Sequence, residues 1–563
     1  MRKTTLYKAV TGMMVAAIAA GCGGGGDSGG FVPVVLPPAT GTTPVVPPDA
    51  PPQMVSNEER CRAIAAQSLP GTEFTVVEYR PAGDFPVPKQ IIPTAETIKS
   101  LPEFCRLSVR LTPSNDSDIK VEIWLPGDHW NGRMLGLGNG GFAGFISYES
   151  LAAGLRRGYA VAHTDMGTGG ATLSFDGSLL RGHPEKWIDW GYRSTHLMTV
   201  LSKASAQRFY SKPPAKSYFM GCSTGGGQGI HEATRYPDDY DGIISGAPAN
   251  DRIGTHIGIA TYWATMKKLP APGMPADKMA LLSSAVLEAC DSDDGVKDGL
   301  ISRPEKCTFN PRVLQCQDAG GANCLTADQV SAVEKLYSPV IDPVTGAVIA
   351  PQLEKGSEPN WSAGLAIDLS TKPPFGELFS WVLGNDFDFL NFDYFRDRQT
   401  VESVLGPVVN ATSKDLTKFR DRGGKIIGFN GTMDALIPPA GFEKYLTSVS
   451  ETTGAGDSFI RFYKAPGMDH CGGGLGPNVF GNDIATPVPL AGDPSRDLLA
   501  ALERWVETGD APDRIIATKF KDNNVAAGEV AMTRPLCPFP KFAKYDGVGD
   551  PNSEKSFSCQ QPG

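Results

Sequence analysis

The stretch FMGCSTGGGQG, residues 219–229, places a cysteine and a serine side by side in a glycine-rich turn. Its centre, Gly221 to Gly225, matches the pattern G-x-S-x-G, in which a serine lies on a strained turn between a strand and a helix. Small residues are needed because larger side chains would clash in so tight a turn. An apolar segment precedes the turn and a helix-compatible segment follows it. The stretch therefore predicts an α/β fold with Ser223 as a nucleophile at the end of a buried strand.

Two other interpretations of this turn are weaker. A phosphate-binding loop is disfavoured because no Lys-Ser or Lys-Thr pair follows the glycines. Cys222 is a second candidate nucleophile, since thiolates attack carbonyl carbons well. An even number of cysteines in an exported chain instead favours a disulfide at Cys222.

Around the turn, short apolar runs alternate with helical spacing. Runs bounded by Gly or Pro predict strands at 120–126, 133–141, 159–167, 216–223, 242–248, 423–431 and 459–467. Residues 194–211 and 497–509 have the spacing of helices. This alternation predicts a parallel sheet with helices on both faces, an α/β-hydrolase core formed by residues 57–250 and 421–563.

The alternation is lost between residues 251 and 420. This region contains four cysteines, an acidic cluster and many aromatic residues. We predict that it is a large inserted lid domain, in which most aromatic side chains form the lid core and some line an acyl pocket. The aromatic residues are Trp263, Trp361, Phe375, Phe379, Trp381, Phe387, Phe389, Phe392, Tyr394 and Phe395.

The remaining catalytic residues are predicted from their order in the chain. In this fold the nucleophile is followed by an acid and then by a histidine, each in a loop after a late strand. Asp434 follows the strand at 423–431, and His470 follows the strand at 459–467. His163 also ends a strand, but it precedes the serine. We therefore predict the triad Ser223, Asp434 and His470, in which His470 is the general base and Asp434 orients it.

An oxyanion hole requires two backbone N–H donors. Thr224, the residue after the nucleophile, is predicted to supply one. The second is expected from the glycine turn GLGNGGFAG, with Gly141 favoured over Gly140.

The N-terminus has the features of a targeting segment. Residues 1–22 begin with basic residues, continue with an apolar run and end in IAAGC, which resembles a lipobox with Cys22 as the lipidated residue. The alternative is an ordinary secretory signal with a chance cysteine. Residues 23–56 are rich in Gly and then Pro, which predicts a solvated tether. We expect an exported protein that is an outer-membrane lipoprotein or is periplasmic or extracellular.

Ten cysteines remain after Cys22, and they permit many pairings. Neighbours in the chain would close short loops as Cys61–Cys105, Cys290–Cys307, Cys316–Cys324 and Cys537–Cys559. Cys222 and Cys471 are then left, and each is adjacent to a predicted triad residue. A serine and a histidine in hydrogen-bond contact would bring these cysteines to about the 5.5 Å Cα separation of a disulfide.

Charge and composition exclude some functions. The net charge of −10 argues against a nucleic-acid partner, and no long apolar run follows the N-terminus. The acidic stretch CDSDDGVKDGL, residues 290–300, offers hard oxygen ligands suited to Ca²⁺. It is not an EF-hand, because Gly295 and Ser302 occupy positions that need ligands. A solvated acidic loop is the alternative, although the flanking cysteines favour an ordered one.

Four blocks together resemble the tannase and feruloyl esterase family: GCSTGG, RYPDDYDGIISGAP (235–248), GTMDALIPP (431–439) and DHCGGG (469–474). The resemblance spans roughly residues 57–560. It implies an α/β-hydrolase core with a lid, a disulfide beside the serine and histidine, and five pairings similar to those above. It also implies a structural lid Ca²⁺ bound by the side chains of Asp291, Asp294 and Asp298 and the carbonyls of Val296 and Leu300.

The resemblance further implies hydrolysis of aromatic carboxylic esters. We expect a monomeric serine esterase that acts on a feruloyl or chlorogenate-type ester, with no membrane contact beyond the lipid anchor. A tannase or a mono(2-hydroxyethyl) terephthalate hydrolase is the alternative within this class. Two positions depart from the family pattern: Gly227, where relatives often have Arg, and Ile437, where terephthalate half-ester hydrolases have an aromatic residue. A non-catalytic surface binding protein is the alternative of another class.

Overall fold

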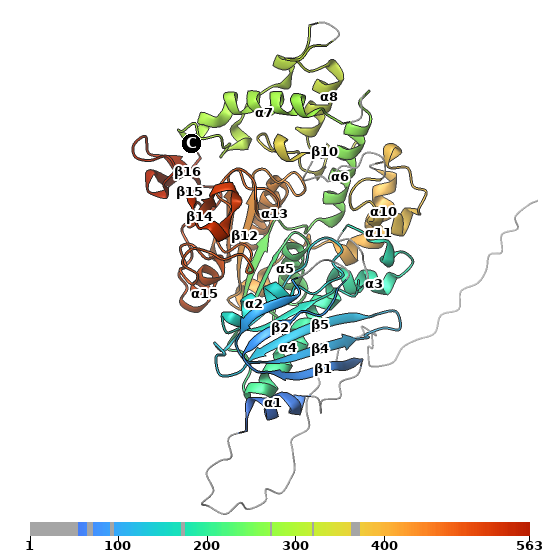
Figure 1. Cartoon of the computed structure of the whole chain (residues 1–563). Coiled ribbons are helices and arrows are strands. Elements are labelled where there is room, and N and C mark those ends of the chain that lie inside the picture. The colour runs from blue at the N-terminus through green and yellow to red at the C-terminus, as the bar shows by residue number, and fades with distance from the viewer. Residues whose placement is uncertain are drawn as a thin grey trace, which may run out of the picture. The chain divides into compact units, whose positions relative to one another are not determined.

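A nine-stranded mixed sheet organises the chain (Figure 1). Its strands lie in the order β1 (Thr72–Arg80), β4 (Phe104–Leu111), β5 (Ile119–Pro126), β7 (Ala160–Thr164), β6 (Arg133–Leu137), β8 (Lys216–Cys222), β9 (Gly242–Gly246), β12 (Lys425–Gly431) and β13 (Ile460–Ala465). From β7 to β13 every neighbouring pair is parallel. The predicted α/β class is confirmed, and the carboxyl ends of β8, β12 and β13 lie at the same edge.

The prediction of an entirely parallel sheet is wrong at one side. β5, which covers the predicted strand at 120–126, is antiparallel to both β4 and β7. The reason lies in the connection, because the few residues between β4 and β5 can join only antiparallel neighbours. β1 pairs antiparallel with β4 and ends this side of the sheet.

The computed structural model describes residues 55–64, 71–90, 95–169, 175–270, 273–317, 320–361, 372–393 and 395–562. All of these belong to one unit, Val55–Gly563. The predicted signal peptide, the lipidation site Cys22 and the tether up to residue 54 lie outside the described residues. None of the helices in the described part is long and apolar enough to cross a membrane.

Helices cover both faces of the sheet because neighbouring strand residues point to opposite sides. On one face, Ile244 and Ile427 pack in a core with α2 (Tyr148–Arg156) and α15 (Leu498–Thr508). On the other, Ile243 and Ile426 pack with α5 (Thr224–Arg235) and α13 (Pro439–Thr453). The same face also carries α4 (Ser194–Tyr210), which packs on β5 and β7 together with α1 (Asn57–Ile64).

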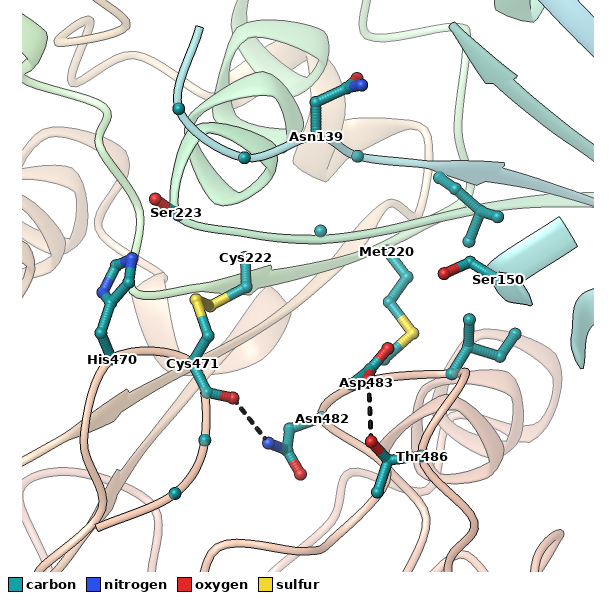
Figure 2. Close-up of a pocket in the computed structure, with 18 of the residues that line it drawn as sticks. Asn139, Ser150, Met220, Cys222, Ser223, His470, Cys471, Asn482, Asp483 and Thr486 are labelled. Carbon is teal, nitrogen blue, oxygen red and sulfur yellow. Dashed lines mark hydrogen bonds between the residues drawn. A yellow bond between two sulfur atoms is a disulfide. The ribbon is translucent and has the colours of Figure 1, made fainter. Parts of the chain in front are cut away.

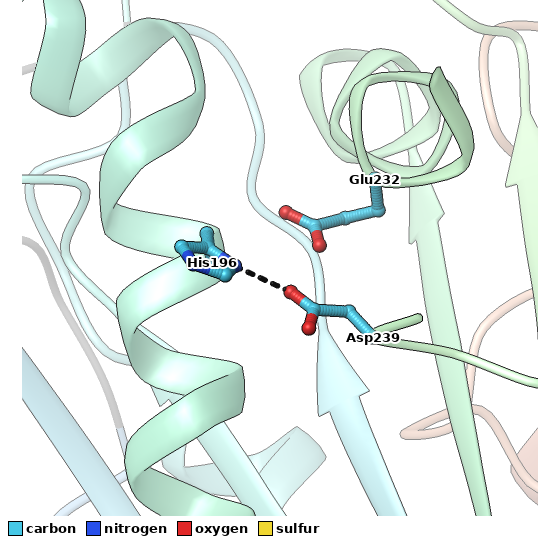
Figure 3. Close-up of side chains that lie close together, drawn as sticks. All are labelled: His196, Glu232 and Asp239. Carbon is cyan, nitrogen blue, oxygen red and sulfur yellow. Dashed lines mark hydrogen bonds and ion pairs between the residues drawn. The ribbon is translucent and has the colours of Figure 1, made fainter. Parts of the chain in front are cut away.

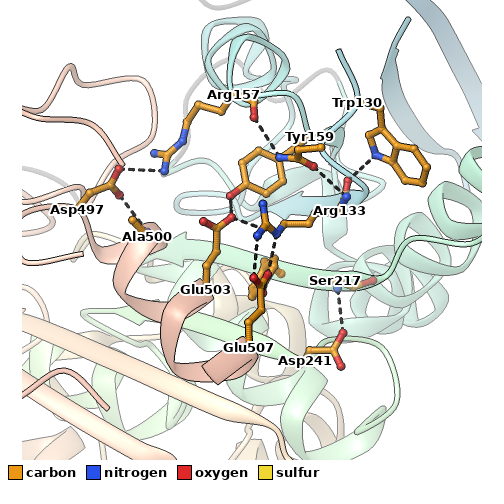
Figure 4. Close-up of polar contacts among 12 residues, drawn as sticks. Trp130, Arg133, Arg157, Tyr159, Ser217, Asp241, Asp497, Ala500, Glu503 and Glu507 are labelled. Carbon is orange, nitrogen blue, oxygen red and sulfur yellow. Dashed lines mark hydrogen bonds and ion pairs between the residues drawn. The ribbon is translucent and has the colours of Figure 1, made fainter. Parts of the chain in front are cut away.

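Ion pairs attach α15 to the amino-terminal ends of central strands of the sheet (Figure 4). Arg133 at the start of β6 binds Glu507 through Nε at 2.7 Å, and Tyr218 of β8 donates to the same carboxylate at 2.9 Å. Arg157 pairs at 2.9 Å with Asp497, whose carboxylate also caps the first turn of α15. Because these groups are half-buried or buried, they fix the helix more firmly than exposed pairs would.

The chain between the end of β9 at Gly246 and the start of β12 at Lys425 forms an insertion between two strands that are neighbours in the sheet, and the predicted lid of residues 251–420 falls within it. The insertion contains α6 (Arg252–Lys267), α7 (Ala276–Cys290), α8 (Ala327–Leu336), α10 (Glu377–Leu383), α11 (Arg396–Val409), α12 (Thr417–Asp421) and the short pair β10 (Val340–Ile341) and β11 (Val348–Ala350). The buried aromatic cluster of the insertion also contains side chains from loops of the sheet region, such as Phe142 and Leu436. The insertion therefore packs onto the sheet region within the same unit.

Smaller elements complete the unit. They are β2 (Gly83–Pro86), β3 (Thr97–Leu101), α3 (Pro184–Ile188), α14 (Gly456–Phe459), β14 (Ile515–Phe520), β15 (Val530–Leu536), β16 (Phe542–Tyr545) and β17 (Phe557–Gln560). The last four strands form two antiparallel pairs, β14 with β15 and β16 with β17.

All five predicted disulfides are present. They join Cys61 to Cys105, Cys222 to Cys471, Cys290 to Cys307, Cys316 to Cys324, and Cys537 to Cys559. Four of them close loops of fewer than fifty residues, whereas Cys222–Cys471 spans 249 residues. Cys222 is therefore a disulfide partner and not a free thiol.

Candidate active site

Ser223 lies on the tight turn between β8 and α5. Its φ of 64° and ψ of −120° are in a strained region that non-glycine residues rarely adopt. The turn can form because Gly221 lies against Gly225, where a Cβ on Gly221 would come within 2.6 Å of backbone carbon. The Ser223 N–H donates to the Gly246 carbonyl at 2.9 Å, which ties the turn to β9. The strained backbone is thus held from both sides.

His470 and Asp434 form the second part of the site. Nδ1 of His470 lies 2.8 Å from Oδ2 of Asp434. The other oxygen of Asp434 accepts from the N–H groups of Leu436 and Ile437 at 2.9 and 2.8 Å, and the carboxylate is fully buried. A carboxylate fixed in this way can hold the imidazole in one orientation and one tautomer.

Opposing effects act on the imidazole of His470. Burial lowers its pKa, but the charge and hydrogen bond of Asp434, followed by the charge of Asp469, outweigh burial, so the pKa lies above the usual value. The main-chain N–H of His470 also donates to Asp469 Oδ1 at 2.7 Å. Asp469 therefore acts on the ring although it does not contact it.

The Cys222–Cys471 disulfide joins the serine turn to the histidine loop. Its Cα atoms are 5.9 Å apart, close to the separation expected from the sequence. Figure 2 shows the Ser223 side chain and the His470 ring beside this bridge, and both residues line one cavity of about 650 Å³.

The same cavity contains the glycine turn predicted for the oxyanion hole. Gly140 and Gly141 line it together with Ser223 and His470. Among the hydrogen bonds of the described residues, none uses the N–H of Gly140, Gly141 or Thr224. Gly141 has φ of +54°, a conformation that favours glycine. The three N–H groups are thus free to bind a ligand, and the geometry leaves both glycines as candidates for the second donor.

Aromatic and polar side chains complete the cavity wall. Phe145 and Phe175, from loops of the sheet region, and Phe375, from the insertion, supply the aromatic lining. Of the insertion's aromatic residues named above, Tyr394 lies outside the described residues, and among the others only Phe375 lines this cavity; Trp263, Trp361, Phe379, Trp381 and Phe389 lie in buried clusters. The polar lining is mainly neutral: Ser150, Asn478, Asn482, Thr486 and Asn523, with Asp483 as an acid.

Residues 105–368 and 377–560 match the family described as tannase and feruloyl esterase. The chain belongs to this family. An uncharacterized esterase of Xanthomonas campestris pv. campestris is 35% identical over 538 residues, covering 89% of this chain and 91% of the relative. A probable feruloyl esterase B-2 of Aspergillus flavus is 35% identical over 485 residues, covering 83% and 89%.

Solved structures agree with this assignment. Feruloyl esterase B from Aspergillus oryzae aligns with a TM-score of 0.82 at 29% identity, covering 90% of this chain and all of the other. Tannin acyl hydrolase from Aspergillus niger aligns with a TM-score of 0.68 at 20% identity, covering 90% and 96%, which is a likeness in fold. The resemblance stated from sequence is confirmed, and this tannase-family chain is an esterase with an α/β-hydrolase-like fold.

The rival histidine of this esterase lies away from the chemistry. His163 is buried in β7, is not part of the cavity wall, and burial lowers its pKa to about 4. Asp434 contacts His470 instead.

Sequence reasoning missed one cation beside the serine turn. Arg252, at the start of α6, is buried, and its Nη1 donates to Thr224 Oγ1 at 3.1 Å; Thr224 in turn donates to the Gly141 carbonyl at 2.7 Å. No acid in the described part forms an ion pair with Arg252, and burial lowers its pKa to about 9. Gly227, one of the two positions noted in the sequence as a departure, lines a small cavity together with Arg252. The available signal was a basic residue, Arg252, directly before the largely apolar segment IGTHIGIATYWA, residues 253–264.

The predicted calcium loop is ordered by its own carboxylates. Asp294 accepts from Val296 N–H and from Ser302 Oγ, and Asp291 accepts from the N–H groups of Asp298 and Gly299. Asp298 forms an ion pair with Arg534 of β15. Among described residues, the one group of three acids or histidines whose ligand atoms lie within 4.8 Å of one another lies elsewhere in the fold.

Proposed function

We propose that this chain is an exported serine esterase that cleaves feruloyl or chlorogenate-type esters through an acyl-enzyme. The observation that carries the proposal is that the strained Ser223, His470 and Gly141 line one cavity, with Asp434 bound to His470 and with free N–H groups at Gly141 and at Thr224, the residue after the serine. Each corresponds to one requirement of acyl transfer, namely a nucleophile, a base and an oxyanion hole.

The proposed reaction has two halves. Nε2 of His470 takes the proton of Ser223 Oγ as this oxygen bonds to the ester carbonyl carbon. The N–H groups of Thr224 and of Gly141 or Gly140 stabilise the resulting oxyanion. His470 then gives the proton to the leaving alkoxide, and the carbon–oxygen bond breaks. In the second half water replaces Ser223 by the same steps, which releases the acid and the free serine.

The cavity wall supports an aromatic acyl group without a free carboxylate. Phe145, Phe175 and Phe375 provide apolar contact surface, while no Lys or Arg is among the described residues that line the cavity. A terephthalate half-ester carries a free carboxylate. In this cavity that carboxylate would be repelled by the carboxylate of Asp483. Ile437 is turned to a different cavity, so the aromatic residue expected there for terephthalate is also missing. The two Aspergillus relatives named feruloyl esterase, at 35% and 29% identity, favour a feruloyl ester over a galloyl ester, because the tannin acyl hydrolase is only 20% identical.

A calcium ion bound at the loop 291–300 is the second part of the proposal. Burial raises the pKa of Asp298 to about 6 despite Arg534, and the charges of Asp294 and Asp291 add to this effect. Three acidic side chains near a single cation, Arg534, favour the binding of a second cation. Oxygen ligands of this kind suit Ca²⁺. None of the hydrogen bonds of the described residues uses the carbonyls of Val296 and Leu300, which leaves them free as ligands. Ca²⁺ would supply charge compensation and loop order, not chemistry.

We propose in addition that the protein is a monomer and that it is lipidated at Cys22 on export.

A fluorophosphonate probe tests the catalytic part. We expect labelling at Ser223 in the wild type and none in Ser223→Ala, with hydrolysis of methyl ferulate reduced by at least about a thousandfold. Ser150→Ala is the matched control, because Ser150 lines the same cavity and should label and turn over like the wild type. No labelling of the folded wild type would favour a non-catalytic binding protein.

A substrate panel tests the acyl group. Methyl ferulate, chlorogenate, methyl gallate and mono(2-hydroxyethyl) terephthalate should be compared by kcat/KM. We expect the terephthalate half-ester to be the poorest, because its carboxylate finds no cation in the cavity. A preference for methyl gallate would instead assign tannase activity.

A further inference from the structure

A second cluster of ionisable side chains lies apart from the catalytic cavity. His196 on α4, Glu232 on α5 and Asp239 in the loop before β9 point toward one another (Figure 3). One ligand atom from each lies within 4.8 Å of the other two. None of the three lines the catalytic cavity, and Glu232 is eight residues beyond Thr224, about 12 Å along the helix.

Glu232 is the unusual member of this cluster. Its side chain is 1% exposed, and no hydrogen-bond donor of the described residues reaches either carboxylate oxygen. Buried carboxylates normally accept several hydrogen bonds, because an unpaired one loses its hydration without compensation. The group facing Glu232 is a second buried carboxylate, Asp239, so the pair needs a cation or a proton between them.

Nearby cations do not fill this need. Lys203 donates to the carbonyl of Asp238 at 3.1 Å, and Arg422 pairs with the side chains of Asp238 and Asp241. Within the described part, neither Glu232 nor Asp239 forms an ion pair with Lys or Arg. The carboxylate of Asp239 binds His196, whose Nδ1 lies 2.6 Å from Oδ2.

We propose that His196, Glu232 and Asp239 form a binding site for a divalent transition-metal ion of the Zn²⁺ type. One imidazole nitrogen and two carboxylate oxygens are a ligand set that Zn²⁺ accepts, with a fourth position for water. Ca²⁺ suits the set poorly, since it requires six to eight oxygen ligands. The His196 side chain is 26% exposed, which gives the ion a path from solvent.

The bound ion would have a structural role. It would join α4, the carboxyl end of α5 and the segment that leads into β9. These parts already meet through the His196–Asp239 contact, the stacking of His196 on Tyr236, and hydrogen bonds of Lys203 to Asp238 and of Thr199 to Tyr240. Because α5 begins at the serine turn, the site stabilises the far end of that helix without contacting substrate. The proposal does not depend on the ester reaction or on the calcium loop.

Isothermal titration of the full chain with ZnCl₂, with Ca²⁺ in excess, tests the site. We expect one Zn²⁺ per chain and release of a proton, measured as a dependence of the heat on buffer ionisation. A proton is expected to leave because the two buried carboxylates of Glu232 and Asp239 face each other without a cation between them, and a metal ligand must be deprotonated to bind. Zn²⁺ should also raise the Tm.

Two variants make the test specific. Glu232→Gln keeps the shape of the side chain and should weaken Zn²⁺ binding at least about tenfold. His183→Gln is the matched control, because His183 pairs with Asp116 at 2.9 Å without a second carboxylate, and it should bind Zn²⁺ like the wild type. Should Glu232→Gln fail to fold, His196→Gln replaces it, since that side chain lies at the accessible side.

The alternative is a proton shared between Glu232 and Asp239. Absence of stoichiometric Zn²⁺ binding to the wild type, or equal binding by Glu232→Gln, would overturn the metal site in favour of that pair. Equal loss of binding in His183→Gln would identify the ion as adventitious and would overturn it as well. Ester hydrolysis should be the same in all these variants, which separates this outcome from any failure of the proposed catalysis.

Discussion

His470 lies between two carboxylates that act on it differently. Asp434 binds Nδ1 directly, whereas Asp469 acts through its charge and through the main-chain N–H of His470. Since a general base must be neutral to accept a proton, activity should disappear as the pH falls below the pKa of His470. Both carboxylates raise that pKa and thereby move the acid limb of activity to higher pH.

Replacing Asp469 should therefore shift the pH profile. Asp469→Asn removes one negative charge, which lowers the pKa of His470, so the acid limb of kcat/KM should move to lower pH. The amide oxygen can still accept the His470 N–H, and the plateau rate should stay within about twofold. The measurement is kcat/KM for methyl ferulate across the acidic and neutral range.

Asp483→Asn is the control for this experiment, because Asp483 lines the same cavity but is not among the groups that act on His470. Its profile should match that of the wild type. An unmoved acid limb in Asp469→Asn would show that Asp469 does not set the pKa of the base.

Arg252 gives a second prediction at the residue scale. Its buried charge lies behind Thr224, and its hydrogen bond to the Thr224 hydroxyl continues to the Gly141 carbonyl. It thus contacts both parts of the proposed oxyanion hole and places a positive charge near them. Arg252→Met should lower kcat by about ten- to a hundredfold with little change in KM.

The stability of Arg252→Met should not fall with its kcat. Removal of a buried charge without an acidic partner costs little or stabilises, because its desolvation penalty disappears. Arg252→Met should therefore unfold at an equal or higher Tm, and Arg252→Lys should recover part of kcat. Arg235→Met is the control. Arg252 lies over the ring of Trp190 and Arg235 over the ring of Tyr192, but Arg235 does not contact Thr224. An unchanged kcat in Arg252→Met would refute the positioning role.

At the scale of elements, the Cys222–Cys471 disulfide holds the end of β8 against the loop after β13. The double variant Cys222→Ala/Cys471→Ala should lose roughly 2–5 kcal/mol of unfolding free energy, as native disulfides do. It should also lose activity, because Ser223 and His470 are adjacent to the two cysteines. Urea unfolding and kcat at a temperature where the variant is folded measure the two effects.

The disulfide Cys316–Cys324 provides the comparison. It closes a separation of only 8 residues within the insertion, and neither cysteine lines the catalytic cavity. Its double alanine variant should lose less stability and retain kcat. If both double variants kept full activity, the first bridge would be a stability element alone.

The elements that were predictable are those whose pattern is local. Apolar runs bounded by Gly or Pro located β6, β8 and β12 within a few residues, and the order of acid and histidine after late strands located Asp434 and His470. The direction of β5 was mispredicted because it depends on the length of the preceding connection. Arg252 and the cavity residue Phe175 were missed because their roles arise only when the insertion packs on the sheet.

At the scale of the whole molecule, the insertion is joined to the C-terminal strands through the predicted calcium loop. Asp298 in this loop pairs with Arg534 of β15, and Val296 packs with Phe557 and Cys537 from the C-terminal pairs. Segments more than 200 residues apart in the chain therefore depend on the order of one acidic loop. Loss of the proposed ion should weaken the fold globally rather than at the catalytic cavity.

Chelation of Ca²⁺ tests this dependence. EGTA should lower the Tm of the wild type, because Asp291, Asp294 and Asp298 then repel one another with Arg534 as the main compensating cation. The residual rate at low temperature should change little, since none of these residues lines the catalytic cavity.

Asp294→Asn should have a low Tm that EGTA does not lower further. Asp293→Asn, which changes an exposed acid of the same loop outside the proposed ligand set, should keep the full response. Equal Tm values of the wild type with Ca²⁺ and with EGTA, and no Ca²⁺ in the purified protein, would show that Arg534 and the loop hydrogen bonds are sufficient.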